Sequence, residues 1–312
     1  MWDKILSAGV SEMTFKAKPL RSELFVPGNK EDWMRKAPRY GADALILDLE
    51  DSVPPVEKAG ARVLVRKMLE ELGPTGQTLI VRVNRLETGL TGDDLEAITC
   101  PYLYAIMLPK VEGPADVVEA DILLKLFERR AGMEVGQVLI DPALETAQGM
   151  RQAYEIAISS ARVAHMGASG GKGGDPARSI GFEWTPEGME TLFFRSKVLL
   201  DSRAAGIPYP VSGGWMDLHK LDGLRAAAQQ AKGLGYTGMH LIHPSHVPVV
   251  NEVFTPTKDD IAQWRGVIAA MEEGRRQGGA AVPFGGDMID IAHEETARIM
   301  LERARDLGVL DS

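Results

Sequence analysis

The stretch that decides the fold is Ala44–Val53, which reads Ala-Leu-Ile-Leu-Asp-Leu-Glu-Asp-Ser-Val. It begins with four consecutive apolar residues, a pattern typical of a strand buried on both faces in a parallel sheet that helices cover. It ends in three carboxylates, Asp48, Glu50 and Asp51. Because burying an unpaired carboxylate is costly, we expect these groups where the strand emerges, facing water, a cation or basic partners. In parallel α/β folds this edge carries the active site.

Short runs of the same apolar or β-branched character recur along the chain, and polar-apolar periodic segments such as Lys30–Arg39 and Gly113–Arg130 lie between them. Eight runs are candidate strands: Ser22–Val26, Ala44–Leu49, Leu79–Val83, Ala105–Leu108, Val138–Leu144, Val163–Met166, Ile207–Val211 and Met239–Ile242. Strands that alternate with helices form right-handed βαβ units, and eight such units favour a closed (β/α)₈ TIM barrel. The alternative is an open doubly wound sheet, but the segment Pro27–Lys30 lacks the Gly-rich dinucleotide fingerprint expected there.

The last sixty or so residues fall outside the eight units, so we expect a barrel over residues 1–250 and a helical extension over 251–312. The segment Thr257–Gly274 begins like a capped helix, and a second helix-like stretch runs from Ile289 to Leu307. A flexible Gly-rich linker, Gln277–Gly286, is expected between them. Two readings stay open: a lid or oligomerisation arm, and a helical tail that packs on its own barrel.

Composition excludes several classes of protein. The 312 residues are 45% hydrophobic and 25% charged, as in ordinary globular proteins, and the net charge of −9 argues against a nucleic-acid partner. Cys100 is the single cysteine, which excludes an internal disulfide and favours a reducing compartment. The first residues lack the apolar core of a secretory signal, and no apolar run approaches the roughly 20 residues that span a bilayer. We therefore expect a cytoplasmic protein with no membrane partner.

The ends of barrel strands converge on one mouth, so residues far apart in sequence can be considered together. After the first strand, Asn29 is expected to cap the next helix, either as a plain cap or as part of a phosphate site. Arg82 alternates with two valines and should point into the mouth, with Asp48 or Glu50 as its partner and one face free for a substrate carboxylate. Lys110 follows the fourth strand as a second cation.

Glu145 and Asp175 follow neighbouring strands, the fifth and the sixth. Two carboxylates at such positions form a site for Mg²⁺, which uses one or two protein carboxylates and leaves its other positions to water and substrate. The Gly-rich segment Gly167–Gly174 fails as a phosphate loop, because Met166 stands where the first glycine is required. A zinc site on His240, His243 and His246 is not expected, because His240 and His243 would face opposite sides of a strand.

At this point six ordered motifs carry a resemblance to a known family. They are Arg21–Gly28, Leu47–Val53, Val81–Asn84, Leu108–Glu112, Leu144–Ala147 and Ile242–Pro244, followed in the tail by Asn251–Pro256 and Met288–Asp290. The chain resembles the citrate lyase β-subunit and malyl-CoA lyase branch of the HpcH/HpaI aldolase family from about Arg21 to its C-terminus.

The resemblance implies a (β/α)₈ barrel, assembled as a homo-trimer or homo-hexamer, that makes or breaks a carbon–carbon bond beside a CoA thioester with Mg²⁺ as cofactor. The expected products are a 2-oxo acid and an acyl-CoA. Glu145 and Asp175 match the family's metal ligands, and Arg82 matches the residue that binds the substrate carboxylate and enolate. Glu50 and Asp51 match an acidic pair that orients the arginine and the metal's waters.

Further roles follow from the same resemblance. Asp290 matches a tail aspartate that a neighbouring subunit contributes as acid or base. The motif residues Pro27, Gly28, Asn84 and Lys110 are expected to bind substrate.

The chain departs from the family pattern in places that bear on the substrate more than on the reaction class. Seven residues separate Gly167 from Asp175, where the family has a short Gly-x-x-Asp, and the segments 212–217 and 238–240 differ from the common versions. Two alternatives to a CoA-thioester lyase therefore stay open. One is an aldolase on a free 2-oxo-3-hydroxy acid, and the other is a non-catalytic or carrier-dependent subunit of a larger lyase.

Overall fold

A computed structural model describes residues 17–310 of the chain. Contacts divide the chain into two compact units, Met1–Asn251 and Glu252–Ser312. The first unit carries the eight-stranded sheet, and the second carries two long helices and a hairpin. Within the described residues no helix combines the length and the apolar character that crossing a membrane requires.

The first unit is a barrel of parallel strands. Its strands are β1 (Ser22–Pro27), β2 (Ala44–Asp48), β3 (Thr78–Arg82), β4 (Ala105–Leu108), β5 (Leu139–Leu144), β6 (Gly167–Ala168), β7 (Val211–Gly213) and β8 (Gly238–Leu241). They pair in the order β6-β5-β4-β3-β2-β1-β8-β7, with every pair parallel. A bridge between Ser169 and Gly213 joins the two outer strands, so the sheet closes. The predicted (β/α)₈ fold is confirmed.

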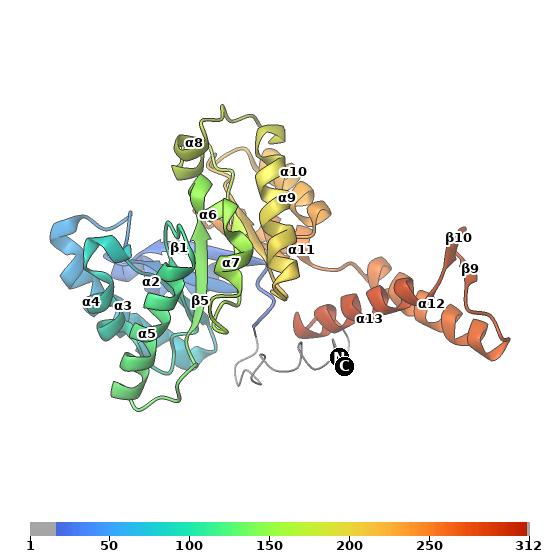
Figure 1. Cartoon of the computed structure of the whole chain (residues 1–312), viewed down its shortest axis with the longest axis horizontal. Coiled ribbons are helices and arrows are strands. Elements are labelled where there is room, and N and C mark those ends of the chain that lie inside the picture. The colour runs from blue at the N-terminus through green and yellow to red at the C-terminus, as the bar shows by residue number, and fades with distance from the viewer. Residues whose placement is uncertain (1–16, 311–312) are drawn as a thin grey trace. The chain divides into compact units, whose positions relative to one another are not determined.

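Helices follow the strands and surround the sheet (Figure 1). They are α2 (Glu31–Lys36), α3 (Lys58–Leu72), α4 (Thr91–Ile98), α5 (Pro114–Arg130), α6 (Ala147–Arg151), α7 (Ala153–Ala157), α8 (Asp175–Ile180), α9 (Met189–Ala204), α10 (Leu221–Leu234) and α11 (His246–Phe254). Short 3-10 helices lie at Ala37–Tyr40, Pro55–Glu57, Gly73–Thr75 and Leu86–Thr88. In α3 the residues at a spacing of three and four, Ala61, Val65, Met68, Leu69 and Leu72, are the buried ones, as an amphipathic helix requires.

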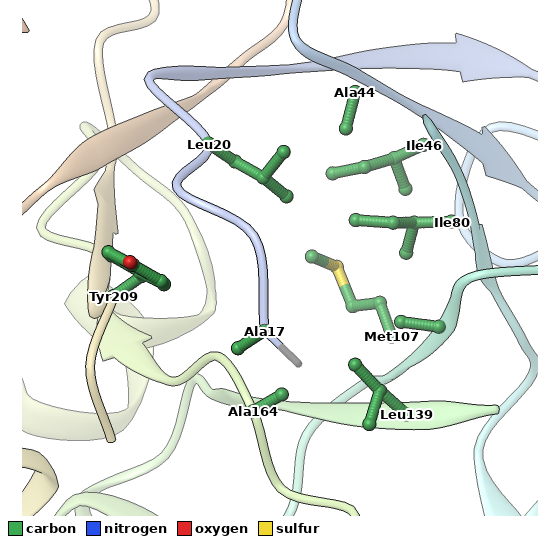
Figure 2. Packing of buried hydrophobic residues seen from close by; sticks show 10 residues of the cluster. Ala17, Leu20, Ala44, Ile46, Ile80, Met107, Leu139, Ala164 and Tyr209 are labelled. Atoms are coloured by element: carbon green, nitrogen blue, oxygen red, sulfur yellow. The ribbon is translucent and has the colours of Figure 1, made fainter. Parts of the chain in front are cut away.

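One cluster of the hydrophobic core lies inside the barrel. Apolar side chains from β2 to β5, among them Ile46, Ile80, Met107 and Leu139, point toward one another, and Leu20 packs on them from the segment before β1 (Figure 2). Every residue of β2 is buried, which is what the continuous apolar run predicted. Full burial of a side chain of this size stabilises the fold by about 1.5–3 kcal/mol.

Two strands lie later in the chain than predicted. The apolar runs Val163–Met166 and Ile207–Val211 are predicted to be strands, but apart from a bridge between Val163 and Ile140 the paired residues are Gly167–Ala168 and Val211–Gly213. The backbones approach closely at this point, because a Cβ on Gly167 would lie 1.6 Å from the carbonyl oxygen of Val211. The close approach of the backbones requires glycine at position 167, so strand pairing occurs there. The apolar runs indicate which residues are buried but not which residues pair.

The second unit contains α12 (Lys258–Arg276), the hairpin of β9 (Val282–Phe284) and β10 (Asp287–Ile289), and α13 (Ile291–Asp306). The predicted cap of α12 is present, because the Thr257 hydroxyl accepts from the Asp260 amide at 3.0 Å. The prediction of a flexible linker between the helices was wrong. The glycines at 285 and 286 both have positive φ and form the turn of the hairpin, whose Phe284 and Val282 pack against α12.

Candidate active site

A cavity of about 470 Å³ opens at the carboxyl ends of the barrel strands. Its lining includes Asp48 at the end of β2, Arg82 at the end of β3, Glu145 just after β5 and Asp175 at the start of α8. The structure therefore brings together residues that the sequence places on four separate elements. This edge of the barrel is where active sites of the fold are built.

Asp48 is the principal partner of Arg82. The two side chains form a bidentate pair, with 2.7 Å from Nε to Oδ1 and 2.7 Å from Nη2 to Oδ2. The same carboxylate accepts from the backbone amides of Glu50 at 2.9 Å and Ser52 at 3.1 Å. Burial alone would raise the pKa of Asp48, but Arg82 and these contacts lower it below its ordinary value. Asp48 is therefore a fixed anion that orients the guanidinium.

The remaining face of Arg82 is held less tightly. Its Nη1 lies 3.4 Å from Glu50 Oε2 and 3.9 Å from Asp51 Oδ2, and its guanidinium lies 4.8 Å from the centre of the Phe25 ring. The side chain is 13% exposed and lines the cavity. This edge of the fork can receive a substrate carboxylate or enolate oxygen.

Lys110 links the acidic loop after β2 to the predicted metal ligands. Its Nζ lies 2.5 Å from Glu50 Oε1, 3.3 Å from Asp51 Oδ2 and 3.7 Å from Asp175 Oδ2. Its backbone amide donates to Glu145 Oε2 at 3.1 Å. Its φ is +52°, a left-handed conformation that is uncommon for a residue with a side chain and typical of functional sites. Lys110 is therefore part of the buried ion network rather than a solvated rim cation.

Glu145 and Asp175, the predicted metal ligands, both line the cavity. Burial raises the pKa of Glu145, although Arg82 and Lys110 oppose this effect. Asp175 is paired with Arg178 and Lys110. The inserted segment from Gly170 to Gly174 does not remove Asp175 from the cavity.

Carboxylates and cationic side chains gather around the cavity. Within the described part of the chain, the carboxylates at or beside it include Asp48, Glu50, Asp51, Glu145 and Asp175. Arg82 and Lys110 are buried cationic partners, Lys172 and His240 also line the cavity, and Arg178 is largely exposed. The carboxylate oxygens of this group are the kind of ligand that Mg²⁺ prefers.

Two residues predicted near the site make other contacts than expected. Asn29 does not cap α2, whose N-cap is Lys30, because the Asn29 amide donates instead to Glu57 at 2.7 Å. Asn84 does not line the cavity, because its side-chain and backbone amides donate to Asp94 Oδ2 at 2.7 and 2.8 Å.

Gly28 has a structural reason to be glycine. A Cβ there would lie 2.6 Å from the Asp48 carbonyl oxygen, and its amide donates to that oxygen at 2.8 Å. Gly28 therefore allows β1 and β2 to approach each other, while Pro27 beside it lines the cavity.

Asp290 lies in the second unit, where it is the N-cap of α13. Its Oδ1 accepts from the Ala292 amide at 3.1 Å and lies 2.7 Å from His293 Nδ1. His293 lowers the pKa of Asp290, and the side chain is 53% exposed. Within its own unit Asp290 is a helix cap, and its role as an acid or base stays a prediction.

The prediction missed His240 as a residue of the cavity. Its ring lies 6.0 Å from the Phe25 ring in an edge arrangement, and two carboxylates behind it, Glu23 and Asp141, raise the pKa of His240 to about 10 although burial opposes this. The sequence pattern groups His240 with His243 and His246, but the partners of His240 lie on other strands. A charged residue inside an otherwise apolar strand, as at Glu23, is the signal that could have found them.

A second cavity of about 540 Å³ adjoins the first and shares Lys172, Trp215 and Met216 with it. Its wall adds Trp184, whose ring lies 5.9 Å from that of Trp215 and under the Lys172 ammonium at 5.8 Å. Lys220 lines the same space. Aromatic faces and ammonium groups together can hold a planar ring and phosphates.

Known proteins resemble this chain over most of its length. The family model for HpcH/HpaI aldolase/citrate lyase matches residues 21–244. The chain is 33% identical to the citrate lyase subunit beta of Haemophilus influenzae, over 91% of this chain and 97% of that protein. It is 35% identical to a (3S)-malyl-CoA thioesterase of Cereibacter sphaeroides, over 95% and 98%.

Two solved structures extend the comparison. The protein CitE from Mycobacterium tuberculosis, in complex with magnesium, acetoacetate and coenzyme A, matches with a TM-score of 0.69 and 29% identity, over 93% of this chain and 98% of that one. A citrate lyase from Burkholderia xenovorans matches with a TM-score of 0.79 over 96% of both chains, at 18% identity, and this likeness concerns the fold alone.

Proposed function

The chain belongs to the HpcH/HpaI aldolase/citrate lyase family, and on that premise we propose that it cleaves or forms the carbon–carbon bond of a β-hydroxyacyl-CoA thioester, as in malyl-CoA or citramalyl-CoA. The family predicted from the motifs is confirmed, and with it the enzyme class of a lyase. The observation that carries the proposal is the meeting of Arg82, Glu145 and Asp175 around one cavity. The products are a 2-oxo acid and an acyl-CoA.

Glu145 and Asp175 would hold Mg²⁺. The position of both carboxylates on the cavity lining supports this, and so does the magnesium in the related structure from Mycobacterium tuberculosis. When bound, Mg²⁺ supplies a Lewis acid for the hydroxyl and carboxylate oxygens of the substrate.

Arg82 would stabilise the charge that develops during cleavage. A base takes the proton from the β-hydroxyl, the carbon–carbon bond breaks, and its electron pair moves onto the thioester as an enolate that is then protonated. Arg82 lines the cavity and is pre-oriented by Asp48, so its charge is in place before the enolate forms.

Glu50 and Asp51 would act through the cations beside them. Glu50 contacts Lys110 at 2.5 Å and Arg82 at 3.4 Å, so it positions both groups without lining the cavity. Burial raises the pKa of Glu50, whereas contacts with Glu50, Lys110 and Arg82 lower that of Asp51 against burial. Asp290 of a neighbouring subunit stays our proposal for the acid/base group, and it requires the homo-trimer or homo-hexamer that the family resemblance implies.

The second cavity favours a CoA thioester over a free acid. A small 2-oxo-3-hydroxy acid needs only the space beside Arg82 and Glu145. The adjoining space with Trp184, Trp215 and Lys220 has no role for such a substrate, but it suits the ring and phosphates of a nucleotide-bearing thioester. The related structure that contains coenzyme A supports the same choice.

The test is a product assay on the purified protein with malyl-CoA, citramalyl-CoA and free 4-hydroxy-2-oxo acids, with 2-oxo acid and free thiol measured in parallel. The proposal predicts 2-oxo acid without free thiol, from thioesters only and dependent on Mg²⁺. Free thiol as the first product would identify a thioesterase, and turnover of the free acids would identify an aldolase. Turnover only with an acyl-carrier protein would identify a carrier-dependent subunit.

A further inference from the structure

A second group of ionisable side chains lies inside the barrel and has no role in the proposed lyase. It consists of Glu23 on β1, Asp141 on β5 and His240 on β8, which we call the interior cluster. One ligand atom from each lies within 4.8 Å of the others. Glu23 is 0% and His240 19% exposed, and His240 also lines the active-site cavity.

Four polar atoms of the interior cluster lack hydrogen bonds. Both oxygens of Glu23, Oδ2 of Asp141 and Nε2 of His240 are buried without a hydrogen-bond partner among the described residues. Nε2 lies 3.3 Å from Glu23 Oε2 and 3.6 Å from Asp141 Oδ2, yet it meets hydrogen-bond geometry with neither. These atoms therefore lie close together without hydrogen-bonding to one another. Leaving such a group unsatisfied costs about 1–3 kcal/mol, and more when it is charged.

The charge of the cluster is also unbalanced. Two carboxylates face one imidazole, so even a protonated His240 leaves one negative charge inside the barrel. A buried charge of this kind requires a proton or a cation. Three ligand groups this close together favour a cation over a proton, because a single proton can be shared by only two of them.

We propose that Glu23, Asp141 and His240 bind one divalent transition-metal ion, at a site separate from that of Glu145 and Asp175. An imidazole with two carboxylates suits Zn²⁺, Mn²⁺ or Fe²⁺, whereas Mg²⁺ prefers oxygen ligands alone. Tetrahedral ligands about 2.1 Å from zinc lie roughly 3.4 Å from one another. The distances of 3.3 and 3.6 Å from Nε2 to the two carboxylates match this spacing.

The position of the interior cluster determines which strands the ion would link and how it could reach the site. β1 pairs with β2 and β8, and β5 pairs with β4 and β6, so no hydrogen bonds link β5 to the other two strands. An ion held by all three would tie opposite walls of the barrel together. His240 borders the cavity, so an ion can enter from there and keep an open position toward it. This inference goes beyond the proposed lyase and does not rest on it.

The test is Zn²⁺ binding to the chelator-treated full chain in excess Mg²⁺, which occupies oxygen-only sites, followed by calorimetry and metal analysis. We expect one Zn²⁺ per chain in the wild type and in Glu145→Gln. Affinity should fall at least tenfold in Glu23→Gln and in His240→Gln. The control is His219→Gln, an exposed histidine outside the cluster, which should bind Zn²⁺ as the wild type does.

A second measurement needs no variant of the barrel interior, which could fail to fold. Wild-type protein with Co²⁺ in excess Mg²⁺ should show the intense visible absorption of a four-coordinate ion with a nitrogen ligand. No uptake of Zn²⁺ or Co²⁺ would overturn the proposal and leave protons as the balancing charge. Uptake that Glu145→Gln abolishes would also overturn it, because the ion would then occupy the lyase site.

Discussion

Two groups of charged residues in the same barrel differ in how their charges are satisfied. In the first, which we call the rim cluster, Asp48 pairs with Arg82 and Glu50 pairs with Lys110. In the interior cluster, Glu23, Asp141 and His240 lie close together without a hydrogen bond at the converging atoms. The paired charges of the rim cluster fix the orientation of Arg82 and Lys110, whereas the unpaired atoms of the interior cluster are open to the ion proposed above.

The largest expected effect of breaking the rim cluster is on folding. Asp48→Asn leaves the Arg82 guanidinium buried without its anion, and breaking a buried ion pair in this way costs about 3–5 kcal/mol. Urea unfolding of the variant and the wild type measures the difference. Glu96→Gln, which removes one side of an exposed pair with Arg130, is the control and should cost less than about 1 kcal/mol.

The same pair predicts a dependence on pH. Burial opposes ionisation of Asp48, but Arg82 and the loop contacts lower the folded-state pKa below the unfolded value of about 3.9. The stabilisation is therefore complete above that pH and is lost as the pH falls through the folded-state pKa. The difference between wild type and Asp48→Asn should shrink in acid. An equal difference at neutral and acidic pH would show that the pair is not its source.

Replacing Arg82 tests the orientation that the rim cluster provides. Arg82→Lys keeps the charge but loses the bidentate contact with Asp48 and the planar edge toward the cavity. We expect kcat to fall by about 10²–10³-fold, as when one preorganised donor is lost. Steady-state kinetics with a thioester measure this, and Arg130→Lys on the surface should change nothing. Wild-type kcat in Arg82→Lys would mean that charge alone suffices.

Glu50→Gln tests whether Glu50 positions Arg82 and Lys110 or instead binds Mg²⁺. Glu50 contacts Lys110 and Arg82 but does not line the cavity, so the variant should lower kcat by roughly tenfold while the affinity for Mg²⁺ stays within about twofold. Mg²⁺ titrations of activity separate the two quantities. Loss of Mg²⁺ binding would instead place the metal on the acidic stretch after β2.

The smallest predicted effect concerns Asp290, the proposed acid/base group, which belongs to neither cluster. We expect Arg82→Ala and Asp290→Asn each to be inactive alone. If a neighbouring subunit donates Asp290 to the site, the two variants unfolded, mixed and refolded together should regain roughly a quarter of wild-type activity, because random assembly rebuilds some complete sites. Each variant refolded alone is the control. No recovery in mixed oligomers would place the acid/base group within one chain.

The two clusters also show what the sequence could and could not predict. The rim cluster follows strand ends, where its carboxylates are adjacent in the chain and its arginine interrupts an apolar run, so its location and partners could be anticipated. The choice between Asp48 and Glu50 could not, because it depends on the register of β2 and β3, which sets Asp48 opposite Arg82.

The interior cluster was not predicted, since each member is a single polar residue on a separate strand and nothing along the chain connects them. The bounds of β6 and β7 could not be predicted either. The apolar runs indicate buried residues, whereas the strand pairing depends on the close approach of the backbones at Gly167. The hairpin in the second unit was missed because paired glycines read equally as a linker and as a turn.

We propose that Glu145 and Asp175 make this barrel a Mg²⁺-dependent lyase. The most direct test of this proposal is the release of 2-oxo acid from malyl-CoA or citramalyl-CoA as Mg²⁺ is titrated, in wild type, Glu145→Gln and the exposed control Glu119→Gln. We expect saturable Mg²⁺ dependence in the wild type and the control, and turnover at least about 10³-fold lower in Glu145→Gln. Release that persists in Glu145→Gln, or that ignores Mg²⁺ in the wild type, would contradict it.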